Sequence, residues 1–357
     1  MKVLLVSGSL PPLPCGVGDY TAALARELSK AGIETVVLTS RGAATNTPYQ
    51  VMPAVKEWGM RELPAVLGLI RAVKPTVVHF QFPTQGYGGS YMPWLLPSLL
   101  KLQGWRVVQT WHEYYPRQGR RALVNVVPFD ALVAVRPAYE ESLAGWRWKL
   151  IRYRKFRFIP NASVIPAVRL TESERLQVRS HFGCGDKSLV AFFGFSAPLK
   201  GIDQLFTICD PVVHHLLLVG TLTDTDLYHV KILQLAKSKP WAGSVTITGH
   251  LKEQEVAMAL AAADAVVLPF VNGGGMWNTT LKAALAQGVF VVTTSSEESG
   301  YAPDLNLYFA KPGDVSEMRA ALSEYCGRRL GTPRAEFSDW SVIARSHLDL
   351  YQAVLGR

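Results

Sequence analysis

The segment 265–294, AVVLPFVNGGGMWNTTLKAALAQGVFVVTT, decides the fold class of this chain. It opens with an apolar run at 265–269 and continues through three glycines into a helical pattern that Gly288 can end. A second apolar run, rich in β-branched residues, follows at 290–293. Strand, helix and strand in this order form a βαβ unit, whose two strands lie parallel in one sheet.

The same alternation of strand and helix patterns extends over most of the chain. Several apolar runs lack polar alternation, as expected of strands that helices cover on both faces of a parallel sheet. The other predicted strands are 3–7, 34–39, 76–82, 106–111, 131–135 and 156–160 in the first half, and 189–193, 215–219 and 245–248 in the second. The sequence therefore predicts an α/β protein with two Rossmann-like, doubly wound parallel-sheet domains that face a cleft.

Length and local signals set the predicted domain boundaries. With 357 residues, the chain is roughly twice as long as one hydrophobic core usually serves. We predict a first domain over 1–165 and a second over 166–337, whose first helix begins at a capping box of Thr171 and Glu174. A final amphipathic helix over 338–357 must bury its apolar stripe, either on the first domain or against a second copy of the chain.

Composition narrows the class of protein. Hydrophobic residues make up 48% and charged residues 18% of the chain, which excludes a disordered protein. No uninterrupted apolar run approaches the ~18 residues of a membrane span, and the run at the N-terminus is too short for a secretion signal. The four cysteines lie far apart, without the spacing of a zinc site or of a disulfide framework. These features favour the cytoplasm.

The net charge of +9 is concentrated in part on the segment 146–158, where six basic residues are interleaved with aromatic residues and no acidic residue occurs. Such a segment attracts an anionic membrane surface, a nucleic acid or a phosphorylated ligand. A solvated strand edge near a domain hinge is the alternative interpretation.

The loops at the carboxyl ends of the strands are the first candidate sites, because open α/β sheets bind ligands there. The loop after 3–7 carries Gly16 and Gly18 directly before a helix, which suits a phosphate or a sugar. A glycine-rich turn that only packs tightly is the alternative. The loop lacks the G-x-G-x-x-G pattern of dinucleotide-binding proteins, which argues against an NAD-dependent oxidoreductase.

Three polar residues follow other strands. His112, after 106–111, could orient a sugar hydroxyl, and His79 is a weaker candidate for the same role. Lys200 stands just before a predicted helix near Ile202, where it could bind a phosphate. A structural histidine and a solvated lysine are the corresponding alternatives.

The loop after 265–269 favours a function over packing, because each of its three glycines costs conformational entropy. Asn278 or Thr279 can cap the next helix, and the backbone amides there would form an anion site. Asp224-Thr225-Asp226 matches a metal-binding Asp-x-Asp pattern, but it stands at a predicted helix start, where Asp is favoured as a cap. We therefore expect no metal ion.

These loops, in this order and spacing, resemble the retaining glycosyltransferases of family 4, which have the GT-B fold of two Rossmann-like domains. The resemblance covers nearly the whole chain, and it implies that the helix over 338–357 packs back on the first domain. It rests on Pro-Pro…Gly-Val-Gly-Asp-Tyr-Thr at 11–21, Thr-x-His at 110–112, Ile-Pro-Asn-Ala at 159–162, Leu-Lys-Gly at 199–201, Ala-Asp-Ala-Val-Val-Leu-Pro-Phe at 263–270 and Leu-x-Ala-Ala-Leu-Ala-x-Gly-Val-x-Val-Val-Thr-Thr at 281–294.

The resemblance implies a nucleotide sugar bound mainly to the second domain, a cytoplasmic enzyme, and no metal or other cofactor. His112 would be the catalytic residue that contacts the transferred sugar. Lys200 would hold the diphosphate, together with backbone amides near Asn278–Thr280. The donor-binding residues that it implies are Gly16, Gly18, Lys200, Gly249, Asn272, Gly274, Asn278, Thr279 and Thr280. The acceptor would be a glycan or a lipid-linked glycan, with the segment 146–158 at an anionic membrane and no nucleic acid partner.

Two departures from the family pattern stand out. Phe195 occupies the position where the family usually has Arg, five residues before the phosphate-binding lysine. The family also usually has two glutamates around the glycine loop, where this chain has Ala283 and a residue within 272–275. The contacts of these glutamates would fall to other side chains or to the backbone.

The sequence thus predicts a retaining, metal-independent glycosyltransferase that uses a nucleotide-diphosphate sugar, with UDP-glucose as the first choice, in surface polysaccharide synthesis. Two alternatives stay open: a nucleotide-sugar epimerase of the same architecture, and a catalytically degenerate protein that still binds a sugar nucleotide.

Overall fold

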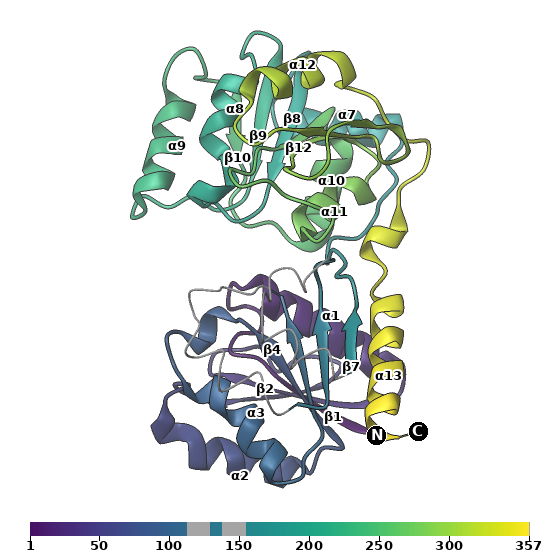
Figure 1. Ribbon diagram of the computed structural model, residues 1–357. Coiled ribbons are helices and arrows are strands. Elements are labelled where there is room, and N and C mark those ends of the chain that lie inside the picture. The colour runs from purple at the N-terminus through teal and green to yellow at the C-terminus, as the bar shows by residue number, and fades with distance from the viewer. Residues whose placement is uncertain (113–128, 138–154, 357) are drawn as a thin grey trace. The chain divides into compact units, whose positions relative to one another are not determined.

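The computed structural model describes residues 1–112, 129–137 and 155–356, and it divides into two units (Figure 1). Unit 1 comprises Met1–Asn161 and Trp340–Arg357, and unit 2 comprises Ala162–Asp339. Each unit is built on one seven-stranded sheet. The predicted fold class, two Rossmann-like α/β domains, is confirmed.

The sheet of unit 1 has the strand order β3-β2-β1-β4-β5-β6-β7, and its strand pairs are all parallel. The strands are β1 (Lys2–Val6), β2 (Glu34–Ser40), β3 (Gln50–Val55), β4 (Val77–Phe82), β5 (Val107–Trp111), β6 (Ala131–Ala134) and β7 (Lys155–Phe158). The described helices are α1 (Gly16–Lys30), α2 (Leu63–Val73), α3 (Met92–Leu102) and α13 (Trp340–Leu355), with the 3-10 helices η1 (Met60–Glu62) and η2 (Gln85–Tyr87).

Strand β4 serves both faces of this sheet. Phe80 and Phe82 point to one face, where they form a core with residues of α2 and α3. His79 and Gln81 alternate with them and therefore point to the other face, although both are completely buried. On that face the ring of His79 lies 2.6 Å from the hydroxyl of Tyr351 in α13. Polar side chains of the central strands thus meet the C-terminal helix.

Helix α13 packs on α1 within unit 1. Tyr20 of α1 stacks edge-on against Trp340, with ring centroids 5.0 Å apart, and its hydroxyl lies 3.3 Å from Nε2 of His347. The buried stripe of α13 consists of Trp340, Ile343, Ala344, His347, Leu350, Tyr351 and Val354. Within the described part of the chain, no helix has the length and apolar character needed to cross a membrane.

The sheet of unit 2 has the order β10-β9-β8-β11-β12-β14-β13, and only β13 pairs antiparallel with its neighbour. The strands are β8 (Ser188–Phe193), β9 (His214–Val219), β10 (Val245–Ile247), β11 (Ala265–Leu268), β12 (Phe290–Thr294), β13 (Gly300–Ala302) and β14 (Leu307–Ala310). The helices are α7 (Glu172–His181), α8 (Ile202–Ile208), α9 (Leu227–Lys237), α10 (Glu253–Ala262), α11 (Thr279–Ala286) and α12 (Val315–Tyr325), with η4 (Pro198–Lys200), η5 (Pro303–Leu305) and η6 (Ala335–Ser338).

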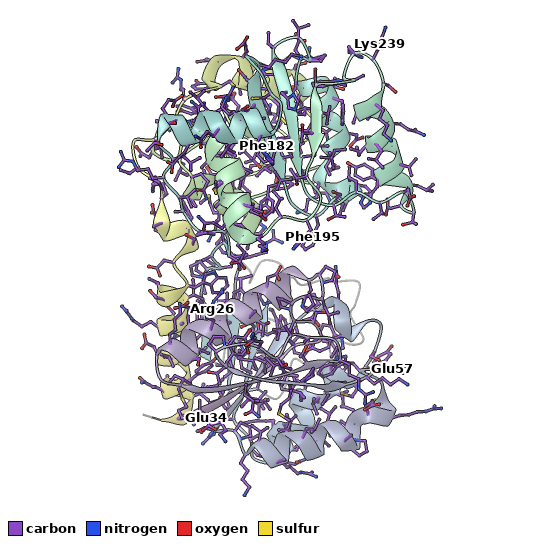
Figure 2. The ribbon with its side chains drawn as sticks, turned by 180° about the vertical axis from the view of Figure 1, so that it is seen from behind. Arg26, Glu34, Glu57, Phe182, Phe195 and Lys239 are labelled. Carbon is purple, nitrogen blue, oxygen red and sulfur yellow. The ribbon has the colours of Figure 1, made fainter. Side chains whose placement is uncertain are left out.

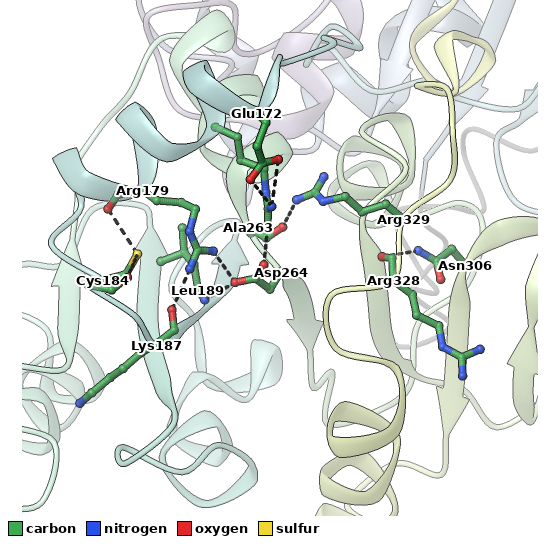
Figure 3. A network of polar contacts seen from close by, with 12 residues as sticks. Glu172, Arg179, Cys184, Lys187, Leu189, Ala263, Asp264, Asn306, Arg328 and Arg329 are labelled. Carbon is green, nitrogen blue, oxygen red and sulfur yellow. Dashed lines mark hydrogen bonds and ion pairs between the residues drawn. The ribbon is translucent and has the colours of Figure 1, made fainter.

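One buried carboxylate holds the amino ends of two strands of unit 2 to α7 (Figure 3). Asp264, just before β11, accepts hydrogen bonds from Arg175 and Arg179 of α7 and from the Leu189 amide of β8, the last at 2.7 Å. Arg329 donates to the carbonyl oxygen of the neighbouring Ala263. These contacts lie at the amino ends of the strands, whereas the candidate site lies at their carboxyl ends. They therefore stabilise the end of the sheet that is remote from the candidate site.

Three strands, β3, β13 and β14, are absent from the sequence prediction. Strand β3 contains Pro53, which cannot donate to a neighbouring strand, and it lies at the edge of its sheet, where proline is tolerated. Strands β13 and β14 have three and four residues. Edge position and short length both remove the long apolar run on which strand prediction depends.

We predict that mild acid loosens α13 from unit 1. Burial lowers the pKa of His79 well below its usual range and that of His347 to about 4. Below the unfolded pKa of about 6.5 the unfolded state binds protons that the folded state does not. The stability that each neutral, buried histidine contributes is therefore fully present above about pH 6.5. Below it, the free energy of unfolding falls toward pH 4, by about 1.4 kcal/mol per pH unit for each histidine.

Hydrogen exchange of the α13 amides, corrected for the intrinsic exchange rate, measures this effect at neutral pH and in mild acid. His347→Gln should flatten the pH dependence, whereas His181→Gln, at an exposed position of α7, should leave it unchanged. Protection of α13 that is equal at both pH values would contradict the prediction.

Candidate functional site

The loop after β1 is held in place by the loop after β4. The Gly8 amide donates to Thr84 Oγ1 at 3.0 Å, and the Gly86 amide donates to Ser9 Oγ at 2.9 Å. A Cβ atom on Gly86 would lie 1.7 Å from the carbonyl oxygen of Gly8, so only glycine fits there. This contact fixes the chain just before α1. Sequence reasoning missed it because Gly8 and Thr84 are 76 positions apart.

The two glycines predicted to bind the donor differ in their surroundings. Gly18 is buried, and a Cβ atom on it would lie 3.0 Å from the carbonyl oxygen of Ser9. Gly16 is exposed at the first position of α1, and a Cβ atom there would meet open space. Packing therefore explains Gly18, whereas nothing in the described fold requires glycine at position 16.

His112 follows β5 and contacts two other elements of unit 1, β4 and α1. Its amide donates to the carbonyl oxygen of Phe82 at 2.7 Å, and its ring Nε2 lies 3.0 Å from Oε1 of Gln81. Tyr20 of α1 packs edge-on against the ring, with centroids 4.5 Å apart. Because Tyr20 belongs to the same motif as the two glycines, the structure brings the first two predicted sites together.

The surroundings of His112 keep its ring neutral. Burial, and secondarily the nearby His347, lower the pKa of His112 to about 3. A neutral imidazole offers one donor and one acceptor but no positive charge. His112 can therefore orient a hydroxyl group, and it cannot act as a cation at neutral pH. His79, the weaker candidate, is completely buried and its ring nitrogens bond to Tyr351 and Thr110.

In unit 2, Lys200 lies at the carboxyl end of β8, at the end of η4. Its ammonium nitrogen lies 4.7 Å from the centroid of the Phe270 ring, within the range of a cation–π contact. The next residue, Gly201, has a φ of +66°, and a Cβ atom on it would lie 2.1 Å from the carbonyl oxygen of Pro269. The loops after β8 and β11 are thus packed together beside Lys200.

Phe195 is exposed close to this lysine in sequence. Its side chain is 57% exposed and projects from unit 2 (Figure 2). Leu199 and Val271 are also exposed, and the Val271 amide donates to the carbonyl oxygen of Leu199 at 3.1 Å. An exposed apolar side chain therefore occupies the position where the family usually has Arg.

The structure gives the three consecutive glycines packing reasons that the sequence analysis did not expect. Gly273 has a φ of +76°. A Cβ atom on Gly274 would lie 2.5 Å from the Phe270 ring, and one on Gly275 would lie 2.1 Å from the Trp277 ring. The Gly274 amide donates to the carbonyl oxygen of Thr294 at 2.7 Å. This amide is thus engaged within the protein, so packing accounts for the glycines without a ligand.

Asn278, one of the two predicted caps, is the residue that begins α11. Its side-chain Oδ1 accepts hydrogen bonds from the amides of Thr280 at 3.0 Å and Leu281 at 3.4 Å. The Thr280 amide, which the resemblance assigns to the diphosphate, is therefore occupied by Asn278 in this conformation. Thr279 is exposed at the first position of the helix. A Cβ atom on Gly194 would lie 3.3 Å from Thr280 Oγ1, which places the loop after β8 against this helix start.

The remaining predicted residues lie in loops of unit 2. Gly249 follows β10 with a φ of +71°, and Asn272 is exposed after β11. Asp226 caps α9 by accepting hydrogen bonds from the amides of Tyr228 and His229, as its position predicted.

Most of the segment 146–158 lies outside the described residues, which include only 155–158 of it.

Lys282 of α11 is a residue that sequence reasoning missed. It is buried, and burial lowers its pKa to about 8. It directly precedes Ala283, the position where the family usually has a glutamate. Lys282 is the one charged residue of α11, and this is the signal that could have identified it, because lysine is almost never buried without a specific reason.

Two family models match the chain. "Glycosyltransferase Family 4" matches residues 14–188, and "Glycosyl transferases group 1" matches residues 187–327. No curated protein sequence matches the chain.

Solved structures of similar architecture cover nearly the whole chain. Sucrose-phosphate synthase from Thermosynechococcus elongatus is 16% identical, with a TM-score of 0.78 and coverage of 100% of this chain and 99% of that one. A glycosyltransferase from Rickettsia africae is 13% identical, with a TM-score of 0.73 and coverage of 99% and 98%. Anabaena HepE in complex with UDP-glucose is 16% identical, with a TM-score of 0.72 and coverage of 100% and 98%. At these identities the likeness establishes the fold.

The two glycines of α1 should respond differently to alanine. We predict that Gly18→Ala lowers the free energy of unfolding by about 1–3 kcal/mol, because its Cβ would press on the backbone of Ser9. Gly16→Ala should leave stability unchanged or raise it by up to about 1 kcal/mol, since alanine is the better helix former. Urea unfolding of both variants measures the difference. Equal destabilisation would show that Gly16 has a packing role after all.

Proposed function

Since the chain belongs to glycosyltransferase family 4, we propose that this glycosyltransferase transfers a sugar from a nucleotide-diphosphate donor with retention of the anomeric configuration and without a metal ion. We propose UDP-glucose as the donor, because the similar Anabaena protein HepE is described with UDP-glucose bound. The resemblance of the sequence motifs to the retaining glycosyltransferases of family 4 supports the proposal of retention.

The observation that carries the proposal is the position of Lys200. Its ammonium group is held against Phe270 at the carboxyl end of β8, and the loop of which it is part packs against the start of α11. A lysine in such a position can bind a diphosphate and stabilise the negative charge that develops as the diphosphate leaves. Phe195 and Leu199, both exposed and apolar, lie close to it in sequence, and the exposed Val271 bonds to Leu199 through its amide. We propose that Lys200 supplies most of the positive charge for the donor.

Metal independence rests on the chemistry of the residues present. Asp226, the second carboxylate of the Asp-x-Asp pattern, accepts hydrogen bonds from two amides at the start of α9. The described residues contain no group of three or more His, Cys, Asp or Glu side chains arranged to hold a metal ion. Charge on the leaving diphosphate would therefore be balanced by Lys200 and by backbone amides.

The other predicted residues take roles that fit their surroundings. Gly16, exposed and without a packing reason, would let the backbone at the start of α1 approach the donor. Neutral His112 would orient a hydroxyl of the transferred sugar. Gly249 would lie near the nucleobase, and Asn272, Asn278 and Thr279 would contact sugar or ribose hydroxyls.

We propose a glycan or a lipid-linked glycan of the cell surface as the acceptor. The described end of the segment 146–158 carries an exposed Arg157 and a half-exposed Phe158. An exposed cation and a half-exposed aromatic ring in one strand suit the surface of an anionic membrane, where a lipid-linked acceptor would reside. A degenerate protein that binds a sugar nucleotide without turnover is the second candidate, favoured by Ala283 at the family's glutamate position.

Replacement of Lys200 should weaken donor binding. We predict that Lys200→Met lowers the affinity for UDP-glucose by about 1.5–3 kcal/mol, the usual contribution of a hydrogen bond to a charged group. Methionine keeps an apolar chain of similar length over Phe270, so the fold should be preserved. Calorimetric titration measures the change, with Lys237→Met, at an exposed position of α9, as the matched control. Equal affinities of the wild type and Lys200→Met would contradict the assignment.

Asn278→Asp separates helix capping from donor binding. The aspartate can accept the same hydrogen bonds from the amides of Thr280 and Leu281, and its charge is favourable at a helix N-terminus by about 0.3–1 kcal/mol. The same charge repels a diphosphate. We therefore predict equal or higher stability together with weaker binding of UDP-glucose, measured by thermal unfolding with and without the nucleotide sugar. Undiminished binding would place the diphosphate away from α11.

A further inference from the structure

A chain of buried polar contacts runs from α13 to His112. The hydroxyl of Tyr351 lies 2.6 Å from Nδ1 of His79, and Nε2 of His79 lies 3.3 Å from Nε2 of Gln81. At the other end of the same amide, Oε1 of Gln81 lies 3.0 Å from Nε2 of His112. Tyr351, His79 and Gln81 are completely buried. Thr110 adds a hydroxyl 2.7 Å from Nε2 of His79.

In the orientation that the Gln81 amide has in this structure, its chemistry fixes which ring nitrogens carry protons. Oε1 of Gln81 can only accept a hydrogen bond, so Nε2 of His112 must donate to it. The Nε2 group of Gln81 can only donate, so Nε2 of His79 must accept. A neutral His79 then carries its proton on Nδ1 and donates it to the hydroxyl oxygen of Tyr351.

We propose that Gln81 is a positioning residue that holds His112 as the Nε2–H tautomer, and that His79 and Tyr351 of α13 hold the Gln81 amide in the orientation this requires. The inference deepens the function proposed above and rests on it, because His112 is there the residue that orients the transferred sugar. Nδ1 of His112 has no hydrogen-bond partner among the described residues. It is left as a lone pair.

The tautomer determines which ligand group His112 can contact. A lone pair on Nδ1 accepts a hydrogen bond from a hydroxyl group and repels a phosphate or carboxylate oxygen. His112 is therefore suited to a neutral sugar hydroxyl as donor of the hydrogen bond, and unsuited to the diphosphate. In the proposed function, His112 would therefore bind the sugar, and Lys200 would bind the diphosphate.

A buried glutamine and histidine on the central strand of a sheet are costly, because apolar residues there would need no hydrogen bonds. Strand β4 has the sequence VVHFQF. Its histidine and glutamine lie on one face, and its two phenylalanines lie on the other. The polar face is hydrogen-bonded from end to end, and its last member is the ring of His112 at the end of β5. This arrangement suits a proton-ordering role better than packing alone.

The tautomer can be read directly in the wild-type chain, without any activity. Selective ¹⁵N labelling of histidine, with long-range ¹H–¹⁵N correlation, distinguishes protonated from unprotonated ring nitrogens. The signals of His112 are assigned by their absence in His112→Gln. We expect a single Nε2–H tautomer for His112 at neutral pH. An Nδ1–H tautomer, or a mixture of the two, overturns the proposal.

Two variants test the relay, by which we mean the chain of hydrogen bonds that runs from Tyr351 through His79 and Gln81 to His112. Gln81→Met keeps the side-chain length and removes both hydrogen-bonding groups, so we expect His112 to populate both tautomers. Tyr351→Phe should change the His112 signals in the same direction but less. Gln109→Met is the matched control, because Gln109 is a completely buried glutamine of the neighbouring strand β5 that bonds to Trp111. A His112 signal that is the same in Gln81→Met as in wild type overturns the relay.

The release of UDP from UDP-glucose, with water as acceptor, supplies the second readout. We expect Gln81→Met to lower kcat about tenfold, the loss of roughly one oriented hydrogen bond, with KM for UDP-glucose nearly unchanged. A rise in KM with kcat unchanged overturns the positioning role. If the wild type shows the expected tautomer but neither binds nor cleaves any nucleotide sugar, the proposed function fails while the tautomer assignment stands.

Discussion

The need to satisfy buried polar groups on one face of a sheet is the constraint on which unit 1 depends. His79 and Gln81 of β4 and Thr110 of β5 are completely buried, and each would cost free energy without a partner. Helix α13 supplies Tyr351, and the loop after β5 supplies His112. The same contacts therefore dock the C-terminal helix and orient the histidine that the sequence singles out. Stability and site geometry are coupled here through one set of hydrogen bonds.

In unit 2 the candidate site is built on close approaches of the backbone. Gly201 admits the carbonyl oxygen of Pro269, and Gly274 admits the ring of Phe270, against which the ammonium group of Lys200 also rests. A glycine-rich loop that resembles a ligand-binding motif therefore has a packing role, because Gly274 makes room for the ring of Phe270. The aromatic ring then positions the cation. Exposed apolar side chains, Phe195 and Leu199, precede this lysine in the loop after β8.

Much of the fold was predictable from sequence because the central strands are continuous apolar runs, as in β8 and β11. The capping box of Thr171 and Glu174 was likewise predictable, because both members lie within one turn. The relay from Tyr351 to His112 was not, because its members are brought together by strand order and by a helix 272 positions away from His79. The packing role of Gly274 also depends on a ring whose position only the fold determines.

Unit 1 is discontinuous along the chain, since Trp340–Arg357 joins it only after all of unit 2. During synthesis on the ribosome, domains generally fold as units in the order in which they emerge. Here His79 of β4 and Tyr20 of α1 emerge first and lack their α13 partners until that helix is made. Unit 2, whose residues are contiguous, is complete before then. The first unit to be translated is thus the last to mature, because one buried face of its sheet is completed only by α13.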